Sequence, residues 1–239
     1  IFEELVAHQV SLLSRRAYIQ QIEAPRISTS RQFAKQLLSS LPFEMTNAQK
    51  RVSKEIVQDL KLNKPMLRLV QGDVGAGKTL VAGVAACHVL EEGWQVALMA
   101  PTEILAEQHY LNFKKWFEPL GLSVSWLSGK QKGKARAAAE QAIVDGTAHL
   151  VVGTHALFQD NVRFAKLGLV IIDEQHRFGV DQRLALRNKG AQNMTPHQLV
   201  MTATPIPRTL AMSAYGDLDT SVIDELPPGR TPIQTVTIP

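Results

Sequence analysis

Short apolar runs alternate with helical patterns along most of this 239-residue chain. The apolar runs lie at residues 67–70, 94–100, 123–127, 149–152, 168–172 and 198–202, and their lengths are typical of buried strands. Helical patterns lie at 47–61, 78–91, 103–117, 131–144, 180–188 and 205–214. Because parallel strands need a crossover helix between them, the alternation predicts an α/β fold, a mostly parallel sheet with helices on both faces.

The two ends of the chain depart from this pattern. Residues 1–41 have a helical periodicity that breaks at Pro25 and resumes after Ser30. The tail from Asp217 loses the alternation and contains the sequence LPPGR at 226–230, which is typical of a linker. We therefore predict three parts: a helical connector at 1–41, an α/β domain at 42–216 and a linker at 217–239.

Composition and charge exclude several classes of protein. The single cysteine, Cys87, cannot form an internal disulfide, which fits a reducing compartment such as the cytoplasm. No apolar run approaches the ~18 residues needed to span a bilayer, so no membrane partner is expected. The first residues form no signal peptide, and they lack an initiator methionine, which indicates a piece of a longer protein. A net charge of +4 is compatible with a polyanionic partner but does not demonstrate one.

The sequence GDVGAGKT at residues 72–79 joins the first apolar run to the helix that follows it. It fits the phosphate-binding loop pattern G-x-x-x-x-G-K-[ST] in the strand-to-helix context that this pattern requires. Backbone N–H groups of the glycine-rich loop and the positive end of the helix dipole favour an anion. Lys78 is expected to reach the β- and γ-phosphates of a nucleotide, and the Thr79 hydroxyl to hold Mg²⁺. The predicted phosphate-binding residues are Gly72, Asp73, Val74, Gly75, Ala76, Gly77, Lys78 and Thr79.

Two adjacent acids follow the apolar run LVII, in the sequence DEQH at residues 173–176. An NTPase needs an acid at the end of a buried strand to hold the Mg²⁺ shell, and Asp173 is placed for that role. Glu174 would position and deprotonate the attacking water. An ordinary solvated turn is the alternative, and the preceding phosphate-binding loop favours the catalytic interpretation. The predicted catalytic residues are Lys78, Asp173 and Glu174.

These two segments, with three others in the same order, resemble the motifs of superfamily 2 helicases and translocases. GDVGAGKT resembles motif I, DEQH motif II, and TAT at 202–204 motif III; APTEILAEQH at 100–109 and VVGTHAL at 151–157 resemble motifs Ia and Ib. The resemblance implies that some residues couple the nucleotide state to DNA and that others contact DNA. The implied coupling residues are Gln175, His176, Thr202 and Thr204, and the implied DNA contacts are Thr102, Gln108, Gly153, Thr154 and His155.

Within that superfamily, DEQHRFGV at 173–180 and TATPIPRTLA at 202–211 are similar to the RecG family of bacterial branched-DNA helicases. This implies a monomeric, ATP- and Mg²⁺-dependent motor with a RecA-like domain that acts on replication forks and Holliday junctions in recombination and repair. The motor domain of a transcription-repair coupling translocase is the alternative, and Gln175 favours RecG because the coupling translocases usually have Glu there. The likeness covers roughly residues 41–239, and the segment before it is similar to the RecG helical connector.

Gln49 permits two interpretations. With Phe43 at the spacing of the family, it matches the helicase Q motif, whose glutamine binds the edge of adenine; both are predicted ATP-binding residues. Thr46 and Gln49 also have the spacing of a capping box at a helix start. Thr102 has a similar ambiguity, because a threonine at a helix start can cap the helix, and neighbouring N–H groups can hold a DNA phosphate.

Other P-loop proteins remain to be considered. A GTPase needs an Asn-Lys-x-Asp sequence after the loop, but the Asn-Lys pair at Asn63 precedes the loop, and the pair at Asn188 is followed by Gly-Ala in place of x-Asp. A small-molecule kinase does not need the ordered motifs Ia, Ib and III. A nucleotide-binding fragment without turnover is a further alternative, because the family places ATP between two RecA-like domains and too few residues follow Thr204 to form the second. We therefore expect the 239-residue chain alone to bind ATP weakly and to hydrolyse it very slowly.

Overall fold

The computed structural model describes Val6, Val10 and residues 22–28, 32–159, 161–173, 194–204 and 218–225. In these residues, strands form one sheet in the order β3-β4-β2-β5-β6-β1-β7, and every neighbouring pair is parallel. The strands are β1 (Leu67–Gly72), β2 (Gln95–Met99), β3 (Val124–Leu127), β4 (Leu150–Gly153), β5 (Leu167–Asp173), β6 (His197–Thr202) and β7 (Asp219–Ile223). All six predicted strands are present, with ends shifted by two residues at most.

The helices between the strands also agree with the periodicity of the sequence. They are α2 (Gln32–Ser40), α3 (Asn47–Leu60), α4 (Lys78–Glu91), α5 (Glu103–Phe117) and α6 (Gly133–Val144), with short 3-10 helices η1 (Glu118–Leu120) and η2 (His155–Phe158). The helices predicted at 180–188 and 205–214, and most of the segment before Pro25, lie outside the described residues.

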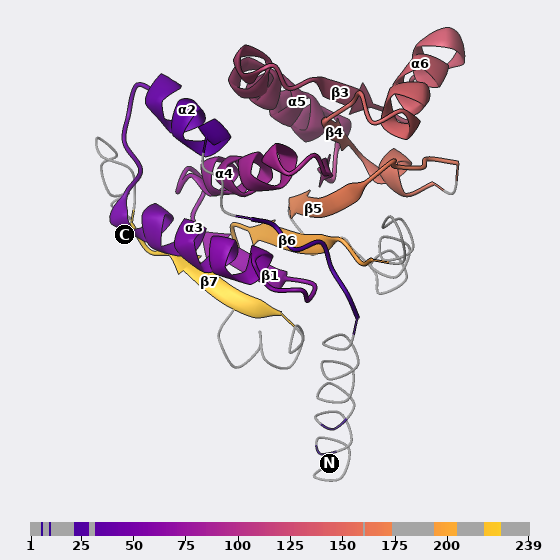
Figure 1. Ribbon diagram of the computed structural model, residues 1–239. Coiled ribbons are helices and arrows are strands. Elements are labelled where there is room, and N and C mark those ends of the chain that lie inside the picture. The colour runs from indigo at the N-terminus through magenta and orange to yellow at the C-terminus, as the bar shows by residue number, and fades with distance from the viewer. Residues whose placement is uncertain are drawn as a thin grey trace, which may run out of the picture.

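Each face of the sheet is covered. Successive strand residues point to opposite faces, so Val96 and Leu98 join one buried cluster while Ala97 and Met99 join another. The first cluster packs against α2, α3, α4 and α5, and the second includes Ile143 of α6. Figure 1 shows α4 over the middle of the sheet with α2 and α5 beyond it. The predicted α/β class, a mostly parallel sheet between helices, is therefore confirmed.

One strand lies where the sequence predicts a linker. Residues of β7 pair with β1, from Arg68 opposite Asp219 to Gly72 opposite Ile223. The strand is at the edge of the sheet, and within it only Ser221 and Ile223 are buried. An edge strand with so little apolar surface has no strong hydrophobic pattern, and for that reason the sequence did not reveal it. The sheet thus continues past the predicted boundary at residue 216.

Helix α4 is the centre of the larger cluster. Its residues from Leu80 to Leu90 are all buried, and Gly83 leaves room for the ring of Trp116 and the side chain of Leu37. Burial raises the pKa of the Cys87 thiol to about 12, which makes it unreactive and agrees with its interpretation as a small core residue. Among the described helices, none has the length and apolar character needed to cross a membrane.

His197 connects the start of β6 to two other segments. Its Nδ1 accepts a hydrogen bond from the Met66 N–H at 3.0 Å, and its Nε2 donates to the Pro25 carbonyl oxygen at 2.7 Å. The ring is fully buried, and this burial lowers the pKa of His197 to about 4, although the bond to Pro25 acts in the opposite direction. The imidazole is therefore neutral in the folded protein at physiological pH.

The His197 pKa predicts a loss of stability in mild acid. Between pH 6.5 and pH 4 the unfolded chain binds a proton at this histidine that the folded chain does not, so the free energy of unfolding falls as pH falls, by about 3 kcal/mol in all. Urea unfolding of the wild type and His197→Gln between pH 7.5 and pH 4.5 measures this term. The difference between the two stabilities should be constant above pH 7 and shrink below pH 6.5. Parallel curves would contradict the prediction.

Candidate functional site

The predicted site residues gather at one edge of the sheet, because the carboxyl ends of parallel strands all face the same way. Gln71, at the end of β1, is paired with Thr202 of β6, and Asp173 of β5 is paired with Met201. On the other side of β5, Met99 of β2 lies beside both Ile172 and Gly153 of β4. The loops that follow β1, β2 and β4 thus share an edge with the ends of β5 and β6, which is where α/β sheets bind ligands.

The loop after β1 has a backbone shaped by glycine. Gly75 and Gly77 have φ values of 82° and 85°, in the left-handed region that side chains disfavour. The Ala76 N–H donates to the Asp73 carbonyl oxygen at 3.0 Å and closes a tight turn. Gly77 leads into α4, whose amino end no described side chain caps. These are the features of an anion-binding nest at a helix start.

Lys78 folds back across this loop. Its ammonium group donates to the carbonyl oxygens of Gly72 and Asp73, at 2.6 and 3.0 Å. These two bonds place a positive charge over the mouth of the loop, beside the amino end of α4. The phosphate contact predicted for Lys78 stays a prediction, and Thr79 follows Lys78 in the first turn of the helix.

Gln49 forms the capping box and also contacts the loop. The Thr46 hydroxyl accepts from the Gln49 N–H at 3.2 Å, while Gln49 Oε1 accepts from the Thr46 N–H at 3.0 Å. The capping box is therefore present. Gln49 Nε2 also donates to the Ala76 carbonyl oxygen at 2.8 Å, and a Cβ at Gly77 would overlap that nitrogen. Gln49 thus anchors α3 to the phosphate-binding loop. At position 77 only glycine leaves space for the Gln49 side chain.

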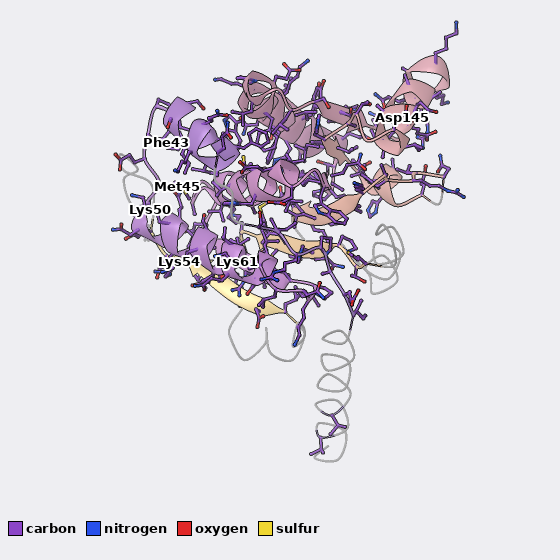
Figure 2. The ribbon with its side chains drawn as sticks, in the orientation of Figure 1. Phe43, Met45, Lys50, Lys54, Lys61 and Asp145 are labelled. Atoms are coloured by element: carbon purple, nitrogen blue, oxygen red, sulfur yellow. The ribbon has the colours of Figure 1, made fainter. Side chains whose placement is uncertain are left out.

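Phe43 precedes this capping box, between α2 and α3. Its ring is 53% exposed, whereas Met45, two residues later, is buried. Figure 2 labels both residues, and Phe43 lies near α2 at the edge of the domain. An exposed ring at this place provides a surface for stacking.

Asp173 ends β5 with its side chain largely covered. Its Oδ2 accepts a hydrogen bond from His109 Nε2 of α5 at 2.6 Å, and the two side chains are 14% and 11% exposed. The sequence did not identify His109 as a site residue. Its position on one helix face with Ala106 and Phe113, both buried, was the available signal that this histidine points inward.

The residues at this edge fit a nucleotide with Mg²⁺. The glycine nest and Lys78 suit phosphate oxygens, and any side chain at Gly77 would displace Gln49 from the loop. The Thr79 hydroxyl and the Asp173 carboxylate are hard oxygen ligands of the kind that Mg²⁺ prefers. Thr79 and Asp173 are thus the residues that would hold the metal. The predicted residues Glu174, Gln175 and His176 lie outside the described residues.

Thr202 and Thr204 form a local turn at the end of β6. The Thr202 hydroxyl accepts from the Thr204 N–H at 3.2 Å, a short-range bond that shapes the chain as it leaves the sheet. Thr202 is buried and Thr204 is exposed. Thr202 is paired with Gln71, immediately before the phosphate-binding loop, so the turn at Thr204 and this loop leave neighbouring strands.

The segments resembling motifs Ia and Ib lie side by side. Thr102 caps α5 by accepting from the Leu105 N–H at 3.3 Å, so the capping role is present. The Ala100 N–H donates to the Gly153 carbonyl oxygen at 3.0 Å, and the Thr154 hydroxyl donates to Glu103 at 3.4 Å. Glu103 also accepts from the Ser128 hydroxyl at 2.7 Å. Glu103 therefore connects the segments that follow β2, β3 and β4. The sequence did not predict these contacts.

The predicted DNA contacts differ in their access to solvent. Thr102, Gln108 and His155 are exposed, Thr154 is half-buried and Gly153 is buried. At Gly153 a Cβ would overlap the carbonyl oxygen of Leu127, so this glycine has a structural function in the sheet. Only the backbone at Gly153 is therefore available for a phosphate, whereas the other residues can offer side chains.

Comparison with known proteins agrees with this geometry. A family model described as "DEAD/DEAH box helicase" matches residues 46–213. The chain is 62% identical over 240 aligned residues to "ATP-dependent DNA helicase RecG" of Escherichia coli (strain K12), and 60% identical to the Haemophilus influenzae protein of the same name. These alignments cover 100% of this chain but 35% and 34% of the relatives, so the chain spans about a third of their length. The resemblance to RecG is confirmed.

Solved structures give the same result. The chain matches "Structure of RecG bound to three-way DNA junction" with a TM-score of 0.86 and 43% identity, over 98% of this chain and 31% of that one. It matches "Crystal structure of Pyrococcus furiosus Hef helicase domain" with a TM-score of 0.56 and 21% identity, over 74% and 38% of the two chains. The second match is a likeness of fold alone.

Proposed function

Because the chain belongs to the DEAD/DEAH box helicase family, we propose that it is the ATP-binding motor domain of a helicase or translocase that acts on branched DNA. The observation that carries the proposal is the shared sheet edge, where the Lys78 ammonium lies across the loop after β1 and Asp173 ends β5. Strong likeness to RecG over the whole chain supports branched DNA as the substrate. We also propose that the protein is bacterial, cytoplasmic and monomeric.

The proposed mechanism assigns a separate task to each group. N–H groups of the glycine nest and the Lys78 ammonium bind the β- and γ-phosphates, and they stabilise negative charge that develops on the γ-phosphate. Thr79 and Asp173 would hold Mg²⁺, which when bound would neutralise charge on the phosphates. Glu174, next to Asp173, accepts a proton from the attacking water.

Two connections would pass the nucleotide state toward DNA. Thr202 lies beside Gln71, so a movement of the phosphate-binding loop reaches the turn at Thr204. Glu103 joins the loops that carry Thr102 and Thr154, which makes the proposed DNA-binding loops move as one unit. We assign Gln175 and His176 to the same coupling by their likeness to motif II.

Binding measurements on the 239-residue chain test the proposal. A fluorescent ATP analogue should bind more tightly with Mg²⁺ than with EDTA, and unlabelled ATP should displace it. A three-way DNA junction should bind more tightly than a linear duplex of equal length, with an affinity that falls as salt rises. Failure to bind ATP would overturn the nucleotide site, and equal affinity for both DNAs would overturn the preference of this domain for branched DNA.

The Gln49 side chain gives a sharper test of base recognition. Its amide oxygen and nitrogen each make one of the hydrogen bonds described above, and each atom can make a second, which is what an adenine edge requires. Gln49→Ala is therefore expected to weaken ATP binding more than GTP binding, by about tenfold. Competition by ATP and GTP against the fluorescent analogue measures this.

The control is Thr46→Ala, which removes one half of the capping box and keeps the Gln49 amide. This variant should be less stable but should retain the preference for ATP. If Gln49→Ala weakens ATP and GTP equally, Gln49 serves only the helix start and the loop, and the proposed adenine contact is incorrect.

A further inference from the structure

A hydrogen bond joins α5 to the acid proposed as a metal ligand. His109 Nε2 lies 2.6 Å from Asp173 Oδ2, although the residues are 64 positions apart in the sequence. A carboxylate that binds Mg²⁺ accepts hydrogen bonds, so the imidazole donates through Nε2–H. Both side chains are at least 86% buried, and few water molecules can substitute for this partner.

The bond restricts how Asp173 can point. A carboxylate has two oxygens, and fixing Oδ2 to His109 determines the direction of Oδ1 as well. We propose that His109 is a positioning residue, which holds the Asp173 carboxylate in the orientation that binds Mg²⁺. This inference rests on the proposed Mg²⁺-ATP site and extends it to a residue on a different helix. Partners of this kind around metal ligands typically change metal affinity by about 10–100-fold.

Packing alone does not account for a histidine at this place. His109 lies on the buried face of α5 between Ala106 and Phe113, where an aliphatic side chain would be buried without a polar cost. The Phe113 ring is tilted at 54° to the imidazole, with centroids 6.4 Å apart, and limits the rotation of the histidine. The imidazole is thus held in place and directed at Asp173.

The same helix is also fastened at its amino end, two turns before His109. Thr102 caps α5, and Glu103 in its first turn accepts hydrogen bonds from Ser128 and Thr154. Helix α5 therefore extends from the loops proposed to contact DNA to the carboxylate proposed to bind Mg²⁺. A displacement of this helix would change the orientation of Asp173 through His109.

Metal dependence of nucleotide binding in the 239-residue chain tests the inference. A fluorescent ATP analogue is titrated with Mg²⁺ for the wild type and for His109→Leu, and its affinity is also measured in EDTA. The Mg²⁺ concentration that gives half of the increase in affinity for the analogue should rise about tenfold in His109→Leu. The affinity measured in EDTA should stay the same. Mn²⁺ binding in the presence of ATP, measured by electron paramagnetic resonance, should weaken by the same factor.

Two further variants separate positioning from packing. His109→Gln keeps an N–H donor near the place of Nε2 and should restore the wild-type Mg²⁺ requirement. His109→Asn carries the same amide on a shorter side chain that cannot reach Asp173, and it should behave like His109→Leu. Comparing His109→Gln with His109→Asn tests the positioning role even if His109→Leu does not fold. Phe117→Leu, a control at a fully buried position of the same helix, should lower the thermal midpoint without changing the Mg²⁺ requirement.

The outcomes distinguish the inference from the function on which it rests. If the wild type shows no effect of Mg²⁺ on ATP affinity, the proposed metal site fails and the inference fails with it. If the wild type responds to Mg²⁺ and the Asn and Gln variants have the same requirement, only the positioning role of His109 is overturned. Equal losses with Mg²⁺ and with EDTA would show that His109 supports the fold alone.

Discussion

Replacing Arg68 with leucine is expected to lower the free energy of unfolding by about 2–4 kcal/mol, because it leaves two acids without their counter-charge. Arg68 lies in β1 with its side chain 11% exposed. Its guanidinium donates to Asp59 at 2.7 Å and to Ser221 of β7 at 2.7 Å, and it lies 3.4 Å from Glu55. One side chain thus fastens α3 and the edge strand to the strand that leads to the phosphate-binding loop. Urea unfolding at pH 7 measures the loss.

A second ion pair at the same boundary provides the matched control. Arg51 of α3 contacts Asp224, just after β7, at 2.8 Å, but the two side chains are 50% and 60% exposed. Arg51→Leu should therefore cost much less than Arg68→Leu. Adding Glu55→Gln and Asp59→Asn to Arg68→Leu should recover part of the stability, since the uncompensated charges cause the loss. Equal effects of Arg51→Leu and Arg68→Leu would contradict the role given to burial.

The main part of the fold was predictable from local pattern. Strong apolar runs such as LVII before Asp173 give strands, and the glycine loop before Lys78 gives a helix start, because each of these signals is contained in a few neighbouring residues. Strand β7 lacks such a signal, since an edge strand buries little and its sequence DTSVI is largely polar. Its place beside β1 depends on long-range contacts with Arg68 and α3.

The site shows the same division between local and distant information. Lys78, Thr79 and Asp173 could be proposed as site residues because a phosphate-binding loop and an acid at a strand end are local patterns. The contacts of His109 with Asp173 and of Glu103 with Thr154 depend on β2 lying between β4 and β5. Strand order was not deduced from the sequence, so neither contact could be predicted.

Replacing Lys78 with alanine is expected to reduce the affinity for ATP by about 10–100-fold, which corresponds to the loss of a charged hydrogen bond to phosphate. The ammonium also bridges the Gly72 and Asp73 carbonyl oxygens, so the variant loses a cross-link of the loop as well as a charge. Displacement of a fluorescent ATP analogue measures the affinity. Lys61→Ala removes the same charge from an exposed position at the end of α3 (Figure 2) and should leave ATP binding unchanged.

In a longer protein that carries both RecA-like domains, Lys78→Ala should also abolish ATP-driven movement of DNA, and comparison with Glu174→Gln separates binding from turnover. Glu174→Gln keeps the loop and its ammonium, so it should bind ATP with Mg²⁺ but should not hydrolyse it. Lys78→Arg keeps the charge, but a planar guanidinium cannot donate to both carbonyl oxygens and a phosphate as the ammonium can, so intermediate affinity is expected. If Lys78→Ala binds ATP as tightly as Glu174→Gln does, the lysine contributes only to the loop, and the phosphates must be held by the glycine nest and the amino end of α4 alone.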